Sequence, residues 1–278
     1  MPFLNISAYK FVALEAPESL QAELRQRCGA AKLKGTILLA PEGINLFLAG
    51  TEAGVRGVLA WLAADPRFAG LPVKESWSDD QPFNRMLVKI KSEIIAMRQP
   101  MIRPMDQRAP SVAPATLKSW LDQGRDDDGR EIALLDTRNG FEVEIGSFEN
   151  ALTPSLKSFG EFPQQLAKLD PQLKDKTVVT FCTGGIRCEK AALYMAGQGY
   201  AHVYQLDGGI LKYFEEVGGA HYRGNCFVFD RRVALTPALT AAGYVECFNC
   251  RAVLSPAQQQ SASYVKGVSC PDCVAGLP

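Results

Sequence analysis

Residues 177–196, TVVTFCTGGIRCEKAALYMA, decide the fold of the middle of this chain. The stretch begins with a β-branched apolar run that is typical of a buried strand, and it ends in an Ala-rich run that is typical of a helix. Cys182 therefore stands where a strand turns into a helix. Gly184 and Gly185 let the backbone curl, so that amide N–H groups and the positive end of the helix can face one sulfur. Such an environment favours a thiolate or a persulfide at Cys182.

The length of this loop limits what it can hold. Arg187 lies five positions after Cys182, which gives the spacing Cys-x4-Arg. Cysteine phosphatases need Cys-x5-Arg to encircle a phosphate, and Cys188 occupies that position here. The shorter ring suits a single extra sulfur atom better than a phosphoryl group. An inert core cysteine is the alternative, but such residues seldom carry a Gly-Gly loop and an arginine.

Length and composition predict a chain of two or three domains. The chain has 278 residues, of which 47% are hydrophobic and 22% charged, as in ordinary soluble proteins. It has no apolar run near 18 residues, and its start lacks a basic region followed by an apolar core, so we expect neither a membrane span nor secretion. Eight cysteines then indicate reduced thiols, metal ligands or catalysis, and a cytoplasmic location.

Residues 1–97 read as alternating strands and helices. The expected elements are a strand over 5–14, a helix over 17–33, a hairpin over 35–49, a helix over 51–64 and a last strand over 86–91. The order βαββαβ fits a ferredoxin-like sandwich, which by itself specifies no function.

Residues 98–114 read as a Pro-rich linker, and residues 115–219 as a second domain. A helix is expected from residue 116, and strands are expected over 131–136, 178–181 and 202–206. This alternation predicts a parallel sheet with helices on both faces. Ligands bind such folds beyond the carboxyl ends of the strands, where Cys182 and Asp136 both fall.

Residues 220–278 have little helical period and hold five of the eight cysteines. Two Cys-x2-Cys pairs, separated by nineteen residues, are a strong signal for a four-thiolate zinc site. The predicted ligands are Cys247, Cys250, Cys270 and Cys273. An iron–sulfur cluster takes the same ligands, and the four cysteines could also stay as free thiols or form two disulfides. Cys226 has no partner at motif spacing and is interpreted as structural.

Charge is unevenly distributed although the chain is neutral overall. Residues 1–110 carry 14 Lys and Arg against 11 Asp and Glu, whereas residues 111–220 carry 11 against 16. A basic stripe in the first segment is a candidate contact for nucleic-acid phosphates, and an ordinary solvated face is the alternative. Its members are Arg85, Lys89, Lys91, Arg98, Arg103 and Arg108.

The middle segment resembles a rhodanese domain, on the motifs Asp136-Thr137-Arg138, the loop 182–187 and Asp207-Gly208-Gly209-Ile210. With its flanks included, the chain resembles the rhodanese-type tRNA uridine(34) hydroxylases. The narrower likeness rests on residues 136–146, 181–190 and 226–230, and on a three-part layout that covers nearly the whole chain. We therefore expect a multidomain chain of mixed α/β and α+β class, with ferredoxin-like, rhodanese-like and small four-cysteine zinc-binding parts.

The resemblance implies oxygen-dependent conversion of the wobble uridine of tRNA to 5-hydroxyuridine. It places the catalytic cysteine at Cys182, with Asp136 and Arg138 as supports of the site. Arg187 either adds positive charge or anchors the loop to Asp136 or Glu142, and Cys188 either packs inward or acts as a resolving thiol. The active-site loop is completed by Thr183, Gly184, Gly185, Ile186, Arg187 and Cys188.

Molecular oxygen is then expected as a co-substrate, with no resident redox cofactor. The chain has only two histidines and no flavin, nicotinamide or haem motif. We expect the Cys182 thiolate to be open to solvent and to add to C6 of uracil, which makes C5 electron-rich; a persulfide at Cys182 is the competing chemistry. The expected partner is the anticodon arm of tRNA, with no membrane or DNA contact.

The sequence is also compatible with two further functions. One is a sulfurtransferase that passes persulfide sulfur to a thiophile or to tRNA, and the second is a non-catalytic RNA or protein adaptor. The sequence does not decide the oxidant, the tRNA isoacceptors or the oligomeric state.

Overall fold

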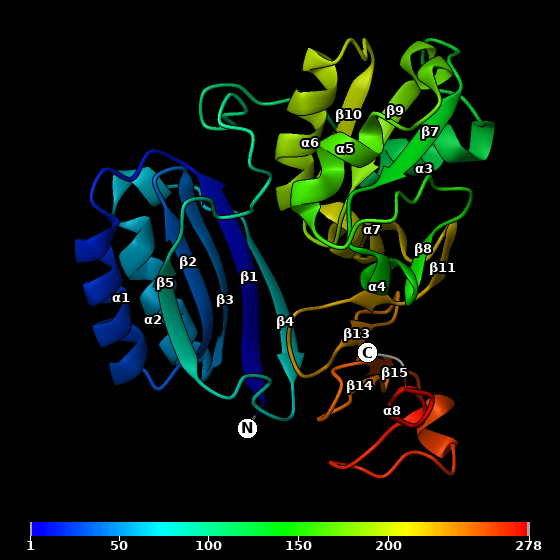
Figure 1. Cartoon of the computed structure of the whole chain (residues 1–278). Helices are drawn as coiled ribbons and strands as arrows, with labels where there is room; N and C mark the ends of the chain where they lie inside the picture. The colour runs from blue at the N-terminus through cyan, green and yellow to red at the C-terminus, as the bar shows by residue number, and fades with distance from the viewer. Residues whose placement is uncertain (1, 277–278) are drawn as a thin grey trace.

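The first unit of the chain is a five-stranded sheet with two helices on one face (Figure 1). The computed structural model describes residues 2–276. The elements are β1 (Phe3–Phe11), α1 (Pro17–Ala30), β2 (Lys34–Ala40), β3 (Gly43–Gly50), α2 (Glu52–Ala63), β4 (Val73–Ser78) and β5 (Met86–Ile90). The order β4-β1-β3-β2 is that of a ferredoxin-like sandwich, which confirms the predicted fold of this unit.

Local sequence explains these elements. Pro17 opens α1, and Leu20, Leu24 and Cys28 bury one side of that helix. Thr51 caps α2, because its side chain accepts a hydrogen bond from the N–H of Gly54. Successive residues of a strand face opposite sides, so one face of the sheet packs against the helices and the opposite face can contact other parts of the chain.

One assignment in this unit is wrong. The sequence pattern predicts residues 86–91 as the last strand of the sandwich, but that strand is β4, over Val73–Ser78. The strand at Met86–Ile90 is an addition that pairs in parallel with β2 at the opposite edge. The pattern of β4, VKESWS, hides it, because an edge strand with no fully buried residue lacks apolar alternation.

The second unit is a four-stranded parallel sheet in the order β6-β10-β9-β7. Its strands are β6 (Ser111–Val112), β7 (Ile132–Asp136), β9 (Thr177–Phe181) and β10 (Val203–Leu206). Its helices are α3 (Pro114–Gln123), α4 (Gly140–Val143), α5 (Phe162–Leu166), α6 (Ile186–Gly197) and α7 (Gly209–Val217). Buried residues of α5 and α6 share one apolar cluster, and those of α3 and α7 share another, so helices cover both faces as predicted.

The C-terminal part contains only short elements. These are β11 (Tyr222–Gly224), β12 (Cys226–Phe227), β13 (Ala234–Leu235), β14 (Val245–Glu246), β15 (Val253–Leu254) and α8 (Pro271–Val274). β11 pairs with β8 (Gly146–Phe148) and so ties this part to the second unit. Within residues 2–276, no helix combines the length and the apolar character that a membrane crossing requires.

A buried lysine joins the first two units. Lys190 of α6 is 2% exposed and contacts two carboxylates of the N-terminal part, Glu42 at 2.7 Å and Glu93 at 2.6 Å. Its ammonium group also donates to the carbonyl oxygen of Ile95 at 3.0 Å. All three donor positions of the ammonium group are thereby used, which fixes α6 against the first sheet.

We expect Lys190→Met to lower the free energy of unfolding by about 3 kcal/mol, because the two carboxylates lose their buried counter-charge. The matched control is Lys118→Met, which breaks an exposed ion pair with Asp122 and should cost less than about 1 kcal/mol. Urea unfolding of both variants measures the difference. Equal losses would show that the buried contact contributes no more than a surface pair.

Candidate active site

The cysteine loop lies between β9 and α6. Cys182 follows the last residue of β9, and Gly185 adopts φ +99°, which turns its N–H toward the Cys182 sulfur at 3.1 Å. On the other side, the N–H of Ile210 donates to the carbonyl oxygen of Cys182 at 2.9 Å. A Cβ on Gly209 would lie 2.4 Å from that oxygen, so only glycine allows this approach.

Arg187 performs both of the roles that the sequence left open. Its guanidinium group forms a two-point ion pair with Glu142, at 2.6 and 2.7 Å, and both side chains are buried. Glu142 is held in turn by α4, where its carboxylate accepts from the backbone N–H of Asn139. The ion pair anchors the loop, and the positive charge also acts on the sulfur of Cys182.

These groups lower the pKa of Cys182. Burial alone would raise the pKa of this thiol, since the charged form loses its water. A hydrogen bond from the Cys188 thiol, the charge of Arg187, and the backbone N–H groups of Arg187 and Gly185 together hold the pKa well below its ordinary value. These groups therefore favour the thiolate form of Cys182.

Cys188 stays protonated. Burial and the neighbouring Cys182 sulfur raise the pKa of the Cys188 thiol. Its side chain packs inward, 0% exposed, with its sulfur 3.8 Å from the hydroxyl oxygen of Thr137. We therefore expect the Cys188 thiol to act as a donor to Cys182, whose pKa it lowers.

Asp136 and Arg138 lie behind the loop and do not line its cavity. They form a fully buried ion pair at 2.6 Å. Asp136 also accepts from Ser147 at 2.8 Å, and Arg138 donates to the carbonyl oxygen of Gly146 at 2.7 Å. The pair fixes the segment after β7 to β8, which is the geometry of a support.

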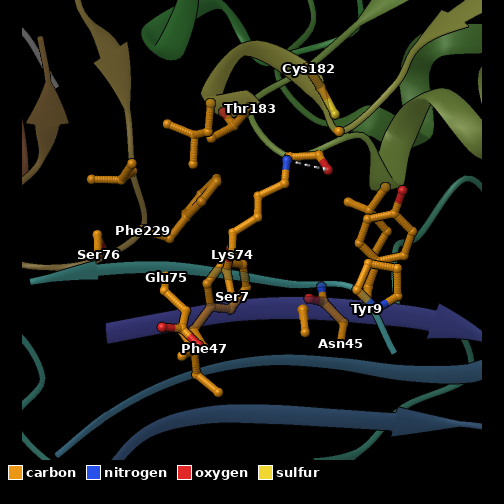
Figure 2. Close-up of a pocket in the computed structure, with 18 of the residues that line it drawn as sticks. Ser7, Tyr9, Asn45, Phe47, Lys74, Glu75, Ser76, Cys182, Thr183 and Phe229 are labelled. Carbon is orange, nitrogen blue, oxygen red and sulfur yellow. Dashed lines mark hydrogen bonds between the residues drawn. The ribbon is translucent and has the colours of Figure 1, made fainter. Parts of the chain in front are cut away.

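One expectation about Cys182 is wrong: the residue is not open to solvent. It is 0% exposed and lies in the wall of a cavity of about 420 Å³ between the first sheet and the second unit (Figure 2). The sequence pattern described the loop alone, and the packing of another unit over it was not visible there. We expect a substrate to approach the sulfur through this cavity.

Two residues of the cavity, Tyr9 and Lys74, carry no sequence signal, whereas Phe229 and Glu189 fall in the stretches 226–230 and 181–190 on which the family resemblance rests. Tyr9 and Lys74 come from β1 and β4, Phe229 comes from the C-terminal part, and Glu189 follows the loop. Burial lowers the pKa of Lys74 to about 8. No local motif identifies Tyr9 or Lys74, because their positions are set by strand alternation and by the packing of two units.

The six members of the basic stripe differ in their surroundings. Of its six members only Arg108 lines the cavity, where it pairs with Glu189 at 2.9 Å. Arg103 pairs with Asp106. Three further members, Arg85, Lys89 and Lys91, lie on or beside β5, at the sheet edge opposite β4. Arg98 follows them in the chain, before Arg103.

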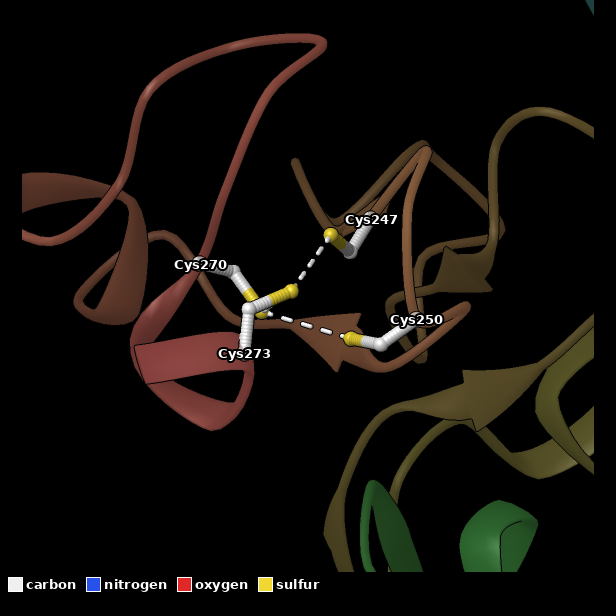
Figure 3. A group of neighbouring side chains, drawn as sticks. All are labelled: Cys247, Cys250, Cys270 and Cys273. Carbon is white, nitrogen blue, oxygen red and sulfur yellow. Dashed lines mark hydrogen bonds between the residues drawn. The ribbon is translucent and has the colours of Figure 1, made fainter. Parts of the chain in front are cut away.

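The four cysteines of the C-terminal part converge (Figure 3). Their sulfur atoms all lie within 4.8 Å of one another, and three of the pairs are 3.5, 3.7 and 3.8 Å apart. Thiolates arranged tetrahedrally about a metal at about 2.3 Å are roughly 3.8 Å apart, so the donor set fits a single ion. Cys226 lies elsewhere, and burial raises the pKa of its thiol to about 12, as suits a structural residue.

Comparison with known proteins agrees with this layout. Residues 3–94 match the family model described as UPF0176 acylphosphatase like domain, and residues 114–216 match that of the rhodanese-like domain. A protein of Cupriavidus taiwanensis named tRNA uridine(34) hydroxylase is 62% identical over 99% of this chain and 98% of its own length. Proteins of the same name from Ralstonia nicotianae and Burkholderia cenocepacia (strain HI2424) are 60% and 56% identical, each over 98% of this chain and over 97% and 98% of their lengths.

We expect Cys188→Ala to raise the pKa of Cys182, because the thiolate loses one donor. A hydrogen bond to a charged group contributes about 1.5 kcal/mol, so the midpoint of Cys182 alkylation should rise by about one pH unit. Iodoacetamide labelling followed by peptide mass spectrometry measures this midpoint. Cys188→Ser keeps a donor and is the matched control; equal midpoints in both variants would contradict the role given to Cys188.

Proposed function

The chain belongs to the tRNA uridine(34) hydroxylase family, and on that premise we propose that it converts the wobble uridine of tRNA to 5-hydroxyuridine. The observation that carries the proposal is the sulfur of Cys182, which accepts from the N–H of Gly185 at 3.1 Å and lies in the wall of a cavity of about 420 Å³. Small-molecule sites commonly have volumes of roughly 300–1,000 Å³, which includes the size of a flipped-out nucleoside.

In this proposal, Cys182 is the nucleophile. Its sulfur adds to C6 of uracil, and the electron pair of the C5=C6 bond moves onto C5 and O4. The electron-rich C5 then takes one oxygen atom from dioxygen. The other oxygen atom leaves as water, with two electrons and two protons from an external reductant. Loss of the C5 proton and of the sulfur restores the double bond and the thiolate.

Aromatic side chains give the cavity a surface on which a base can stack. Phe229 is 48% exposed, and its ring lies 6.4 Å from that of Phe47 across the cavity wall. Stacking on aromatic rings is the usual way that proteins hold an unpaired RNA base. We propose that uridine 34 enters here while the anticodon arm stays outside.

The rest of the anticodon arm needs a positively charged surface. We propose that residues 1–97 and 98–114 supply it together with the cysteine-rich residues 220–278, in the cytoplasm where tRNA is found. The proposed contacts remain Arg85, Lys89, Lys91, Arg98, Arg103 and Arg108. Binding of this kind weakens with salt in proportion to the number of phosphates contacted.

The test is nucleoside analysis of tRNA treated with purified protein in air, with a two-electron reductant added. The wild-type chain should form 5-hydroxyuridine, and Cys182→Ser should form none, because a hydroxyl group is not ionised at neutral pH. Cys28→Ala, a change in the core of the first unit, is the control and should retain activity. Full activity of Cys182→Ser would overturn the mechanism. Thiouridine as the product, with a removable adduct of about 32 Da on Cys182, would instead show sulfur transfer.

We infer that the four-cysteine site holds a structural zinc ion. This part has only a small apolar cluster, made largely of the cysteines themselves, so ligation must supply much of its folding energy. We expect about one zinc per chain by elemental analysis, and its loss in Cys250→Ser together with faster proteolysis of residues 243–276. Iron with visible absorbance would identify a cluster instead.

A further inference from the structure

Lys74 reaches from the first sheet to the cysteine loop. Figure 2 shows its side chain extending from β4 toward the loop that carries Cys182 and Thr183. Its ammonium group donates to the carbonyl oxygen of Gly184 at 3.3 Å, although the two residues are 110 positions apart in the chain. Lys74 and Cys182 line the same cavity.

Strand register explains why this lysine faces the cavity. Ser7 of β1 is paired with Lys74 of β4, and Asn5 is paired with Ser76. Paired residues of antiparallel strands point to the same face, and all four line the cavity. The intervening Ile6 of β1 borders the cavity as well, but it is buried in the apolar core of the first unit.

Tyr9 places the same face of the sheet against the loop at a second point. Its hydroxyl oxygen lies 3.0 Å from the position that a Cβ on Gly185 would take. The hydroxyl also donates to Glu189 at 3.4 Å. The first sheet is therefore a wall of the site, in contact with two residues of the cysteine loop.

The charge on Lys74 is not neutralised by a carboxylate. Within the described residues, no carboxylate oxygen lies within 4.0 Å of its ammonium group. The three arginines of the cavity wall differ, because each has a carboxylate partner: Arg108 pairs with Glu189, Arg187 with Glu142, and Arg232 with Asp230. The other lysine of the wall, Lys10, donates instead to the carbonyl oxygen of Ala69 at 2.6 Å. Lys74 thus presents a positive charge to whatever occupies the cavity.

We propose that Lys74 is a catalytic residue, whose ammonium group stabilises the negative charge that forms on the uracil ring when Cys182 adds to C6. The inference rests on the proposed function and names a second group of that site. As the S–C6 bond forms, the C5=C6 electron pair moves onto C5 and O4, and Lys74 donates a hydrogen bond to O4. Its proton stays on the nitrogen throughout, so no further reactant is needed.

The surroundings of Lys74 suit this role. A preorganised donor in a cavity shielded from water stabilises a developing charge more than the same donor in bulk solvent does. The influences on the pKa of Lys74 oppose one another. Burial is the largest and lowers the pKa, as Lys212 also does, whereas Cys182, Cys226 and Asp207 act to raise it; the resulting pKa is about 8. The group is therefore protonated at neutral pH and loses its charge as the pH rises through about 8.

The test compares two variants of Lys74 with a matched control in steady-state hydroxylation of tRNA. Lys74→Met removes the charge at similar length and should lower kcat by about 100-fold. Lys74→Arg keeps a charge that does not titrate, so the activity that remains should lose the alkaline decline expected near pH 8 in the wild type. Lys34→Met, at a half-buried lysine of β2 outside the cavity, should change neither kcat nor the pH profile.

A second measurement isolates the addition step from oxygen chemistry. In the absence of oxygen, an anticodon stem-loop RNA with 5-fluorouridine at position 34 should form a covalent adduct with the wild-type chain, in which sulfur is bonded to C6 and C5 has taken a proton from water. The adduct is resolved on a denaturing gel, and Cys182→Ser should form none. Lys74→Met should form this adduct about 100-fold more slowly. An adduct at the wild-type rate would overturn the catalytic role of Lys74.

The outcomes separate this inference from the proposed function. If Lys74→Met only raises KM or lowers the melting temperature, with kcat and pH profile unchanged, Lys74 is a contact between units and the inference fails alone. If the wild-type chain forms neither 5-hydroxyuridine nor the adduct, the proposed function fails and the inference falls with it.

Discussion

The burial of one ionisable sulfur, that of Cys182, governs the arrangement of this protein's site. A thiol buried as deeply as Cys182 would normally remain neutral, because ionisation costs more away from water. The donors around it reverse that preference. Arg187 contributes a full positive charge, but a buried guanidinium group is itself costly unless it is paired. Glu142 supplies the pair, which requires α4 and its cap at Asn139 to stand where they do.

The need to enclose the sulfur of Cys182 explains why the site is built from more than one unit of the chain. A thiolate in an open loop would be hydrated, and it would gain less from the dipoles and charges around it. The first sheet closes the site and contributes Lys74 and Tyr9 to its wall. Lys190 holds the second unit against Glu42 and Glu93, so the closing contact is itself an electrostatic one.

The C-terminal part completes the enclosure rather than standing apart. Phe229 supplies aromatic surface, and Arg232 donates to Ser76 of β4 at 2.8 Å. Short strands and a small apolar cluster give this part little stability of its own. A metal held by four cysteines suits such a segment, since ligation replaces the core that its length does not allow.

The sequence alone determined the features that depend on neighbours in the chain. The strand, glycine loop and helix around Cys182, the Cys-x4-Arg spacing and the pairing of four cysteines in two Cys-x2-Cys motifs all follow from short-range pattern. It missed β4, whose residues alternate in no apolar pattern, and it left Cys182 open to solvent. Only the tertiary structure decided that Lys74 meets the cysteine loop and that the thiolate is enclosed. Both features depend on contacts between residues more than 100 positions apart in the chain. Local periodicity predicts which face of a strand is apolar, but it does not predict which faces pack together.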